Sequence, residues 1–307
     1  MNALELNNIS KSYSGKLALK GVNFLLEEGV VAGLVGPNGA GKTTLFSTIA
    51  GFISPDQGEV KIFGRPLNSL DSLNGLVSIL PQDARFQKGI SIKRQLQWYS
   101  KLMGLGEKEG YEETERVLKL VDLLKAAEKE GDQLSHGMHK RMAVAQAFIA
   151  NPKIILLDEP TSGLDPANAR QIRNVITRQK GKQSFLVSSH NLDEIADLCD
   201  FVVILDKGKV VESSSMSAFV KEESLITVSL SEIPNKSQIT SLETMDFVKS
   251  IKLSEDGQRL AIFISENYTE DPAILASLAV KLAEVQVKFT GMSKGSTLEE
   301  RFLEITE

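Results

Sequence analysis

Short apolar runs alternate with segments of helical periodicity along residues 1–215. The runs at 30–35 and 154–157 contain only apolar residues and glycine, which predicts strands buried on both faces of a sheet. Further strands are predicted at 4–6, 17–26, 58–63, 75–80, 184–188, 201–205 and 210–211, and helices at 43–50, 138–150, 168–180 and 192–198. Strands that alternate with helices indicate a parallel sheet with helices on its faces.

A helical pattern interrupts this alternation over residues 90–130. Apolar residues recur at helical spacing from Leu96 to Leu102 and again from Val117 to Leu124, and the glycine-rich stretch 104–110 between them predicts a loop. A helical subdomain is therefore predicted at about 85–150.

The character of the chain changes near the serines at 213–215. Strands are predicted at 225–230, 247–253, 259–264 and 285–289, helices at 236–242 and 273–283, and a last helix at 297–303. The order βαββαβ predicts a small ferredoxin-like domain at 221–307, separate from the part at 1–215.

Composition places the chain among ordinary globular proteins. Of 307 residues 42% are hydrophobic and 24% charged, and 35 basic against 40 acidic residues give a net charge of −5. This balance disfavours a general nucleic-acid binder, although a local basic patch stays possible. The single cysteine, Cys199, excludes an intrachain disulfide and is interpreted as a buried structural thiol. No apolar stretch reaches the length of a membrane-spanning helix and no signal peptide is evident, so we expect a cytoplasmic protein that needs a partner to work at a membrane.

A phosphate-binding loop follows the apolar run at 30–35 and opens a predicted helix. It fits G-x-x-x-x-G-K-[ST], and its candidate binding residues are Gly36, Pro37, Asn38, Gly39, Ala40, Gly41, Lys42, Thr43 and Thr44. Glycines let backbone N–H groups approach an anion, and the helix N-terminus adds partial positive charge. Lys42 would reach the β- and γ-phosphates, and the Thr43 hydroxyl would bind Mg²⁺. A glycine-rich turn with a chance lysine is disfavoured by the flanking elements, but the loop alone indicates only a nucleoside triphosphate.

Two acids end the apolar strand at 154–157. Asp158 is the candidate Mg²⁺ ligand, and Glu159 is the candidate general base for an attacking water. The alternative is a solvated strand end with two surface acids. The four preceding apolar residues and the upstream phosphate loop argue against it.

Further motifs appear in a fixed order around these two. They are Tyr13, Gln82 after Ile-Leu-Pro, the segment Leu134-Ser135-His136-Gly137-Met138, the segment Ser162-Gly163-Leu164-Asp165, and His190 after a strand. With the phosphate loop and the acidic pair, this set resembles the ATP-binding subunit of an ABC transporter over residues 3 to about 215. The resemblance implies an α/β P-loop NTPase cassette, with a mixed sheet core and a helical subdomain, followed by a small α+β domain.

The resemblance also implies a mechanism for these residues. Two copies would sandwich two ATP molecules head to tail, and Ser135 and Gly137 would touch the γ-phosphate bound by the other copy. Asp165 would support the partner's site, and His190 would hold the γ-phosphate and the water. Gln82 would bind Mg²⁺ and report occupancy of the site. Tyr13 would stack on adenine, or serve simply as a strand residue. His190 and Gln82, each taken alone, could equally be residues with only a structural role.

Two positions depart from the family's Leu-Ser-Gly-Gly-Gln signature. His136 replaces the first glycine and Met138 replaces the glutamine. A protonated His136 would attract phosphate, whereas a neutral one would point away from it. The Ser-x-Gly-Met form and the C-terminal extension resemble exporter-type ATPases with separate permeases, which transport drugs, antibiotics or sodium.

The expected partners are therefore an integral-membrane permease and a second copy of the chain, with no nucleic acid, and the expected place is the cytoplasmic face of the cell membrane. Trp98 and Tyr99 are candidate anchors for the permease, or core residues of the helical subdomain. Two alternatives stay open: a soluble ATP-driven switch that acts on the ribosome or nucleic acid, and a nearly inactive cassette with a regulatory C-terminal domain.

Overall fold

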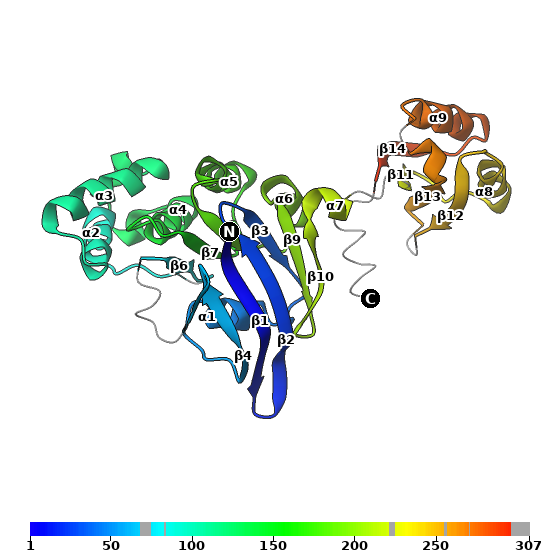
Figure 1. The fold of residues 1–307 in the computed structure, drawn as a ribbon. Coiled ribbons are helices and arrows are strands. Elements are labelled where there is room, and N and C mark those ends of the chain that lie inside the picture. Colours follow the sequence, from blue (N-terminus) through cyan, green and yellow to red (C-terminus); the bar gives the residue numbers. More distant parts are fainter. Residues whose placement is uncertain (68–74, 83, 221–224, 255–256, 270, 296–307) are drawn as a thin grey trace. The chain divides into compact units, whose positions relative to one another are not determined.

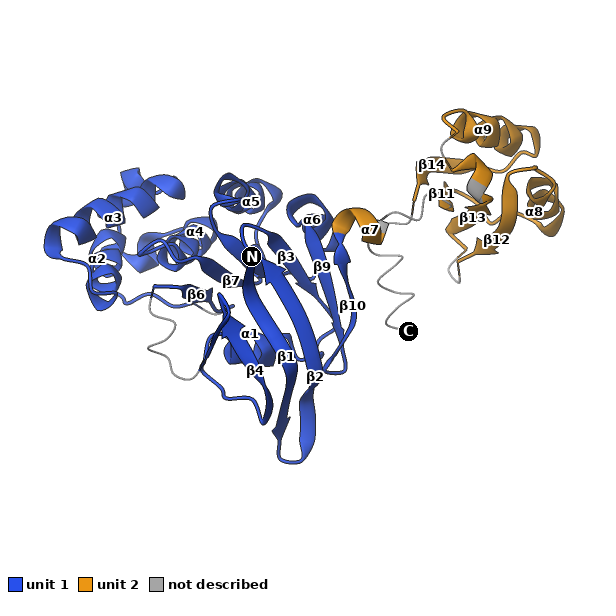
Figure 2. Cartoon of the chain, viewed as in Figure 1, with its two compact units in different colours: residues 1–215 blue, residues 216–307 orange. Residues whose placement is uncertain are grey.

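The chain divides into two compact units, residues 1–215 and 216–307 (Figure 2). The computed structural model describes residues 1–67, 75–82, 84–220, 225–254, 257–269 and 271–295. The last predicted helix, at 297–303, lies outside these residues.

The first unit contains two sheets (Figure 1). An antiparallel sheet has the order β2-β1-β4-β5 and consists of β1 (Asn2–Tyr13), β2 (Lys16–Glu27), β4 (Gln57–Ile62) and β5 (Arg65–Pro66). A six-stranded sheet has the order β10-β9-β3-β8-β7-β6 and consists of β3 (Val31–Val35), β6 (Val77–Leu80), β7 (Ile154–Asp158), β8 (Ser184–Ser188), β9 (Phe201–Asp206) and β10 (Lys209–Ser215). In this second sheet β9 and β10 pair antiparallel, and the pairs β9–β3, β3–β8, β8–β7 and β7–β6 are parallel. The central strands β3, β7 and β8 are buried along their whole length, as their apolar sequences dictate.

Helices flank the six-stranded sheet. They are α1 (Lys42–Ile49), α5 (Pro166–Gln179) and α6 (Leu192–Leu198), and the helical subdomain contributes α2 (Ile92–Leu102), α3 (Glu107–Leu120) and α4 (His136–Ala147) with 3-10 turns at Leu124–Ala126 and Gly131–Gln133. Figure 1 shows α2, α3 and α4 gathered beside the β6 side of the sheet.

The helical subdomain corrects two sequence predictions. The loop predicted at 104–110 ends early, because α3 already begins at Glu107. The Glu109 carboxylate accepts a hydrogen bond from the Gly106 N–H, which caps this helix end (3.1 Å). The helical pattern predicted to run through Leu124 stops at Leu120, because Asp122 adopts a left-handed φ of 54° that no α-helix accommodates.

The second unit has the element order βαββαβ after a short helix, α7 (Met216–Val220). Its elements are β11 (Leu225–Leu230), α8 (Lys236–Glu243), β12 (Val248–Leu253), β13 (Arg259–Ile264), a 3-10 turn at Glu266–Tyr268, α9 (Ile274–Glu284) and β14 (Phe289–Lys294). The four strands pair antiparallel in the order β12-β13-β11-β14. Alternate residues of β11 and β13, such as Ile226 and Ile262, join Leu278 of α9 in a core of their own.

The last strand of this unit differs from its prediction. The sequence predicts a strand at 285–289, but β14 begins at Phe289. Val285 ends α9 and Gln286 has a positive φ of 59°, so the chain turns here before it can extend. Val287 is buried in the core from this turn, which explains the apolar pattern that predicted a strand.

The strand order brings three loops of the first unit together. β3, β8 and β7 are parallel neighbours, so the segments that follow them emerge at one edge of the sheet. Those segments begin at Gly36, Ser189 and Glu159. Among the described residues, no helix combines the length and apolar character required to cross a membrane.

Candidate functional site

The phosphate loop is packed so closely that two of its glycines admit no side chain. A Cβ at Gly36 would lie 2.2 Å from the carbonyl oxygen of Leu205 on the neighbouring strand β9. Gly41 has a φ of +112°, and a Cβ there would lie 2.7 Å from the carbonyl oxygen of Ala18. The loop therefore runs directly against backbone on both sides, and α1 starts from it with no side-chain cap on its N-terminus.

Lys42 folds back over this loop. Its Nζ donates hydrogen bonds to the carbonyl oxygens of Gly36 (2.5 Å) and Pro37 (3.3 Å). The residue is only 8% exposed. Burial lowers the pKa of Lys42, while the charges of Glu159 and Asp158 oppose that shift. The ammonium group is therefore electrostatically coupled to both acids that end β7.

The two acids are held by a serine that sequence reasoning missed. The Ser188 hydroxyl donates to Asp158 Oδ1 (2.6 Å) and accepts from the Glu159 backbone N–H (2.9 Å). Glu159 has a positive φ of 51°, a strained backbone of the kind found at functional sites. The available signal for Ser188 is a serine that directly follows three apolar residues at the end of β8.

The Glu159 carboxylate gathers two predicted site residues. Its Oε2 lies 2.5 Å from His190 Nε2 and accepts a hydrogen bond from Gln82 Nε2 (3.4 Å). Glu159 is buried, whereas the His190 side chain is 54% exposed. The phosphate loop, the acidic pair, Gln82 and His190 thus form one cluster.

Three other predicted residues form a second cluster. Ser135 caps α4, where its hydroxyl accepts from the Met138 N–H (3.3 Å). Gly137 lies against Asn168, since a Cβ there would meet Asn168 Cγ at 2.4 Å. Asn168 Nδ2 donates to Asp165 Oδ2 (2.6 Å), and the Asn168 hydrogen bonds hold the pKa of Asp165 below its ordinary value. The described contacts tie these residues to one another rather than to the phosphate loop.

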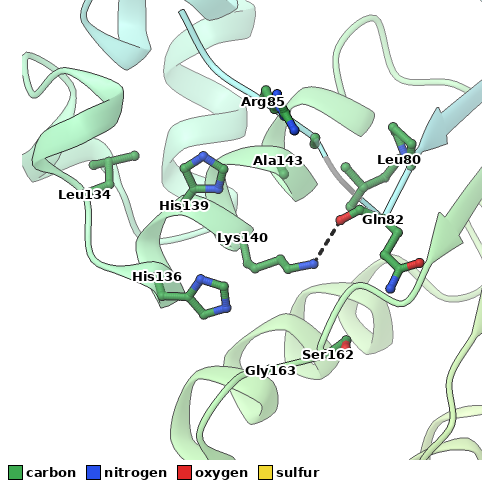
Figure 3. A pocket seen from close by; sticks show the side chains of 12 residues that line it. Leu80, Gln82, Arg85, Leu134, His136, His139, Lys140, Ala143, Ser162 and Gly163 are labelled. Carbon is green, nitrogen blue, oxygen red and sulfur yellow. Dashed lines mark hydrogen bonds between the residues drawn. The ribbon is translucent and has the colours of Figure 1, made fainter. Parts of the chain in front are cut away.

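A cleft of about 610 Å³ lies between the segment that carries Gln82 and helix α4 (Figure 3). His136 points into it beside Gly163, and the Lys140 Nζ donates across it to the Gln82 carbonyl oxygen (3.2 Å). His139 also lines the cleft. Its pKa is lowered mainly by burial, and the neighbouring His136 and Lys140 lower it further. Helix α4, which begins in the segment 134–138, is therefore linked directly to the backbone of Gln82.

Tyr13 lies at the end of β1, where it pairs with Lys16 across the hairpin. Ala18, two residues farther along β2, contacts Gly41 of the phosphate loop. The ring is 46% exposed and has Lys11 Nζ 6.0 Å from its centroid. This hairpin end is thus continuous with the segment that borders the phosphate loop.

Comparison with known proteins decides the family. The family described as ABC transporter matches residues 19–162. The lipopolysaccharide export system ATP-binding protein LptB of Haemophilus influenzae is 32% identical over 248 residues, which are 76% of this chain and 98% of that protein. The chain belongs to the ABC transporter family. It is an ATP-binding subunit and an ATPase of this family.

Other matches extend the comparison. The linearmycin resistance ATP-binding protein LnrL of Bacillus subtilis is 26% identical over 309 residues. The match covers 99% of this chain and 98% of LnrL, so it spans both units. A dimeric ATP-binding cassette bound to ADP and phosphate is 25% identical, with a TM-score of 0.64 over 69% of this chain and 98% of that chain. The predicted family and the α/β cassette fold are confirmed.

Proposed function

We propose that this cassette hydrolyses ATP at the cluster around Glu159 and thereby drives a separate membrane permease. The observation that carries the proposal is the contact of the Glu159 carboxylate with His190 and Gln82, next to the buried ammonium of Lys42. Glu159 takes the proton of the attacking water, and His190 and Lys42 hold the γ-phosphate. Catalysis then consists of positioning and charge stabilisation.

The residues present fit MgATP. The closely packed glycines at 36 and 41 leave a backbone surface free of side chains, and the loop supplies N–H groups at a helix N-terminus. The described residues include no group of three or more His, Cys, Asp or Glu that could hold a metal. Mg²⁺ held by one carboxylate, one hydroxyl, one amide oxygen and phosphate does not require such a group. Asp158, Thr43 and Gln82 would hold Mg²⁺, which neutralises phosphate charge when bound. Tyr13 would stack on the adenine.

The second cluster, Ser135, Gly137 and Asp165, acts on the nucleotide that is bound by the other copy of the chain. Within one chain Ser135 and Asp165 cap helices and Gly137 packs against Asn168, and none of the three reaches the phosphate loop through the described contacts. A head-to-tail dimer brings them to a phosphate loop, because each loop then faces the partner's signature. The dimeric cassette among the similar structures supports this arrangement.

The permease docks on the first unit, in an apolar groove of about 360 Å³ between the sheet domain and the helical subdomain. The groove is lined by Phe52, Leu102, Tyr99 and Met103, among others. Phe52 is 65% exposed and Leu102 is 81% exposed. Such exposed aromatic and aliphatic side chains suit a helical segment of an integral-membrane protein. Of the two aromatic candidates, Tyr99 lines the groove, whereas Trp98 instead contacts Arg94 (5.9 Å to the ring centroid).

Export is the proposed direction of transport, since LptB and LnrL are named for export and resistance. Neither name supports the ribosome or nucleic-acid alternative. The cassette then works at the cytoplasmic face of the membrane through its permease. We also propose that residues 1–215 form the working cassette, with its helical subdomain at about 85–150, and that 221–307 form an accessory domain of ferredoxin-like type.

Mixed dimers test the proposed site. Lys42→Ala removes the phosphate-loop lysine of one copy, and Ser135→Arg obstructs the signature of the other, so we expect each purified variant alone to lack ATPase activity. Mixing them restores one intact composite site in the mixed dimers, which predicts about a quarter of the wild-type rate, because half of the dimers carry one of two sites.

The control is an equal mixture of Lys42→Ala with the double variant that carries both changes, which rebuilds no intact site. Recovery in the first mixture and none in the second supports the proposal. An inactive first mixture, with dimers verified by mass measurement, contradicts the shared site.

A further inference from the structure

A buried carboxylate joins three segments around the hydrolysis cluster. Glu194 lies in the first turn of α6 and is 8% exposed. Its Oε2 accepts hydrogen bonds from Thr161 Oγ1 (2.6 Å) and Ser189 Oγ (3.1 Å). Its Oε1 accepts from Arg173 Nη1 (2.6 Å). The donors come from the segment after β7, the segment after β8 and helix α5.

Two of these donors belong to the segments that carry the reacting groups. Thr161 follows Glu159 by two residues, and Ser189 directly precedes His190. Ser189 Oγ also accepts from the Asn191 N–H (3.1 Å), and Asn191 Oδ1 accepts from the Glu194 N–H (3.1 Å). The backbone on both sides of His190 is therefore fixed to Glu194 or to its helix.

The third donor extends the connection to the second cluster. Arg173 lies on α5, the helix whose N-terminus is capped by Asp165 through the Asn168 N–H (3.0 Å). A buried carboxylate that accepts three hydrogen bonds, one of them from an arginine, holds its donors in a narrow geometry. Glu194 thus connects α5, through Arg173, to the segments of Glu159 and His190.

We propose that Glu194 is a positioning residue for ATP hydrolysis, which sets the distance between Glu159 and His190 and couples both to the Asp165 helix. This inference rests on the proposed function, because it requires His190 to act in hydrolysis. Glu194 itself makes no contact with the phosphate loop in the described structure, so its loss alters the rate of hydrolysis and leaves ATP binding intact.

The test compares three substitutions. Glu194→Ala is expected to lower kcat by about 10- to 100-fold with the Kd for ATP within about twofold, as a small misplacement of reacting groups costs this much. Glu194→Gln keeps an oxygen for Arg173 and a polar group for the two hydroxyls, so it restores most of the rate. Asp193→Ala changes the exposed neighbouring acid and leaves kcat unchanged.

A double variant separates positioning from general destabilisation. If Glu194 acts by placing His190 relative to Glu159, the pair His190→Ala with Glu194→Ala is slowed by clearly less than the product of the two single losses. The inference is overturned if the fold-reduction of kcat in the double variant equals the product of the two single reductions. It is also overturned if Glu194→Ala has the wild-type kcat. Should Glu194→Ala fail to fold, Ser189→Ala removes one of the bonds and decides the same way. A His190→Ala enzyme with full activity refutes instead the role proposed for His190.

Discussion

Glu159→Gln is expected to reduce kcat for ATP hydrolysis by about 10²- to 10⁴-fold, the usual contribution of a general base. The amide has the same shape as the carboxylate, so the buried site keeps its packing, and Gln82 and His190 stay within reach of it. What is lost is the ability to accept a proton from water. ATP binding depends on the phosphate loop and persists, so the variant accumulates as an ATP-bound dimer. Steady-state phosphate release and size-exclusion chromatography with ATP measure the two effects.

Asp197→Asn is the matched control for this change. Asp197 lines, with Glu159 and His190, a second cleft of about 490 Å³. It is exposed, and we expect Asp197→Asn to leave the rate unchanged. A Glu159→Gln enzyme with a rate within about threefold of wild type would exclude Glu159 as the base, since general-base catalysis contributes far more than that.

Gly36→Ala is expected to abolish high-affinity ATP binding and to destabilise the first unit. The added Cβ would lie 2.2 Å from the Leu205 carbonyl oxygen, and the obstacle is backbone of β9, a strand paired on both sides, rather than a movable side chain. Either β9 or the phosphate loop must shift. Overpacking of this kind costs about 1–3 kcal/mol. A loop shift of 1 Å displaces the N–H groups that hold phosphate, for which we expect a loss of about 10- to 100-fold in ATP affinity.

Gly110→Ala is the matched control in the same unit. Gly110 lies inside α3, where a Cβ would meet Ser100 Cβ at an ordinary 3.4 Å. Alanine favours a helix interior by up to about 1 kcal/mol over glycine, so thermal unfolding should occur at an equal or higher temperature with ATP affinity unchanged. Equal melting temperatures and equal ATP affinities for wild type and Gly36→Ala would contradict the close packing of the loop.

The sequence predicted those parts of the molecule that are formed by residues close together in the chain. The phosphate loop is contiguous, and an apolar run that ends in two acids marks a strand end whatever the rest of the chain does. The predictions failed where one backbone conformation decided the outcome. Asp122 ended a helix that the apolar spacing would have continued, and Gln286 delayed β14.

The network around Glu194 could not be predicted, for a different reason. Its bonds to Thr161 and Arg173 join residues 33 and 21 positions apart, and nothing in the pattern of either segment names the other. Only the strand order β3-β8-β7 brings these segments to one edge of the sheet. The Ser188 bonds to Asp158 and to the Glu159 N–H have the same origin in strand pairing.

A pull-down of tagged Glu159→Gln protein from detergent-solubilised membranes, with and without ATP and Mg²⁺, tests whether this ATPase drives a separate permease. The control carries Phe52→Asp and Leu102→Asp in addition, which places charge in the apolar groove and leaves the hydrolysis cluster untouched. We predict that a multi-span membrane protein is recovered with Glu159→Gln and is lost with the groove variant, while both proteins still dimerise with ATP. Recovery of only the soluble dimer, or of ribosomal material, would contradict an ATPase subunit that drives a separate permease.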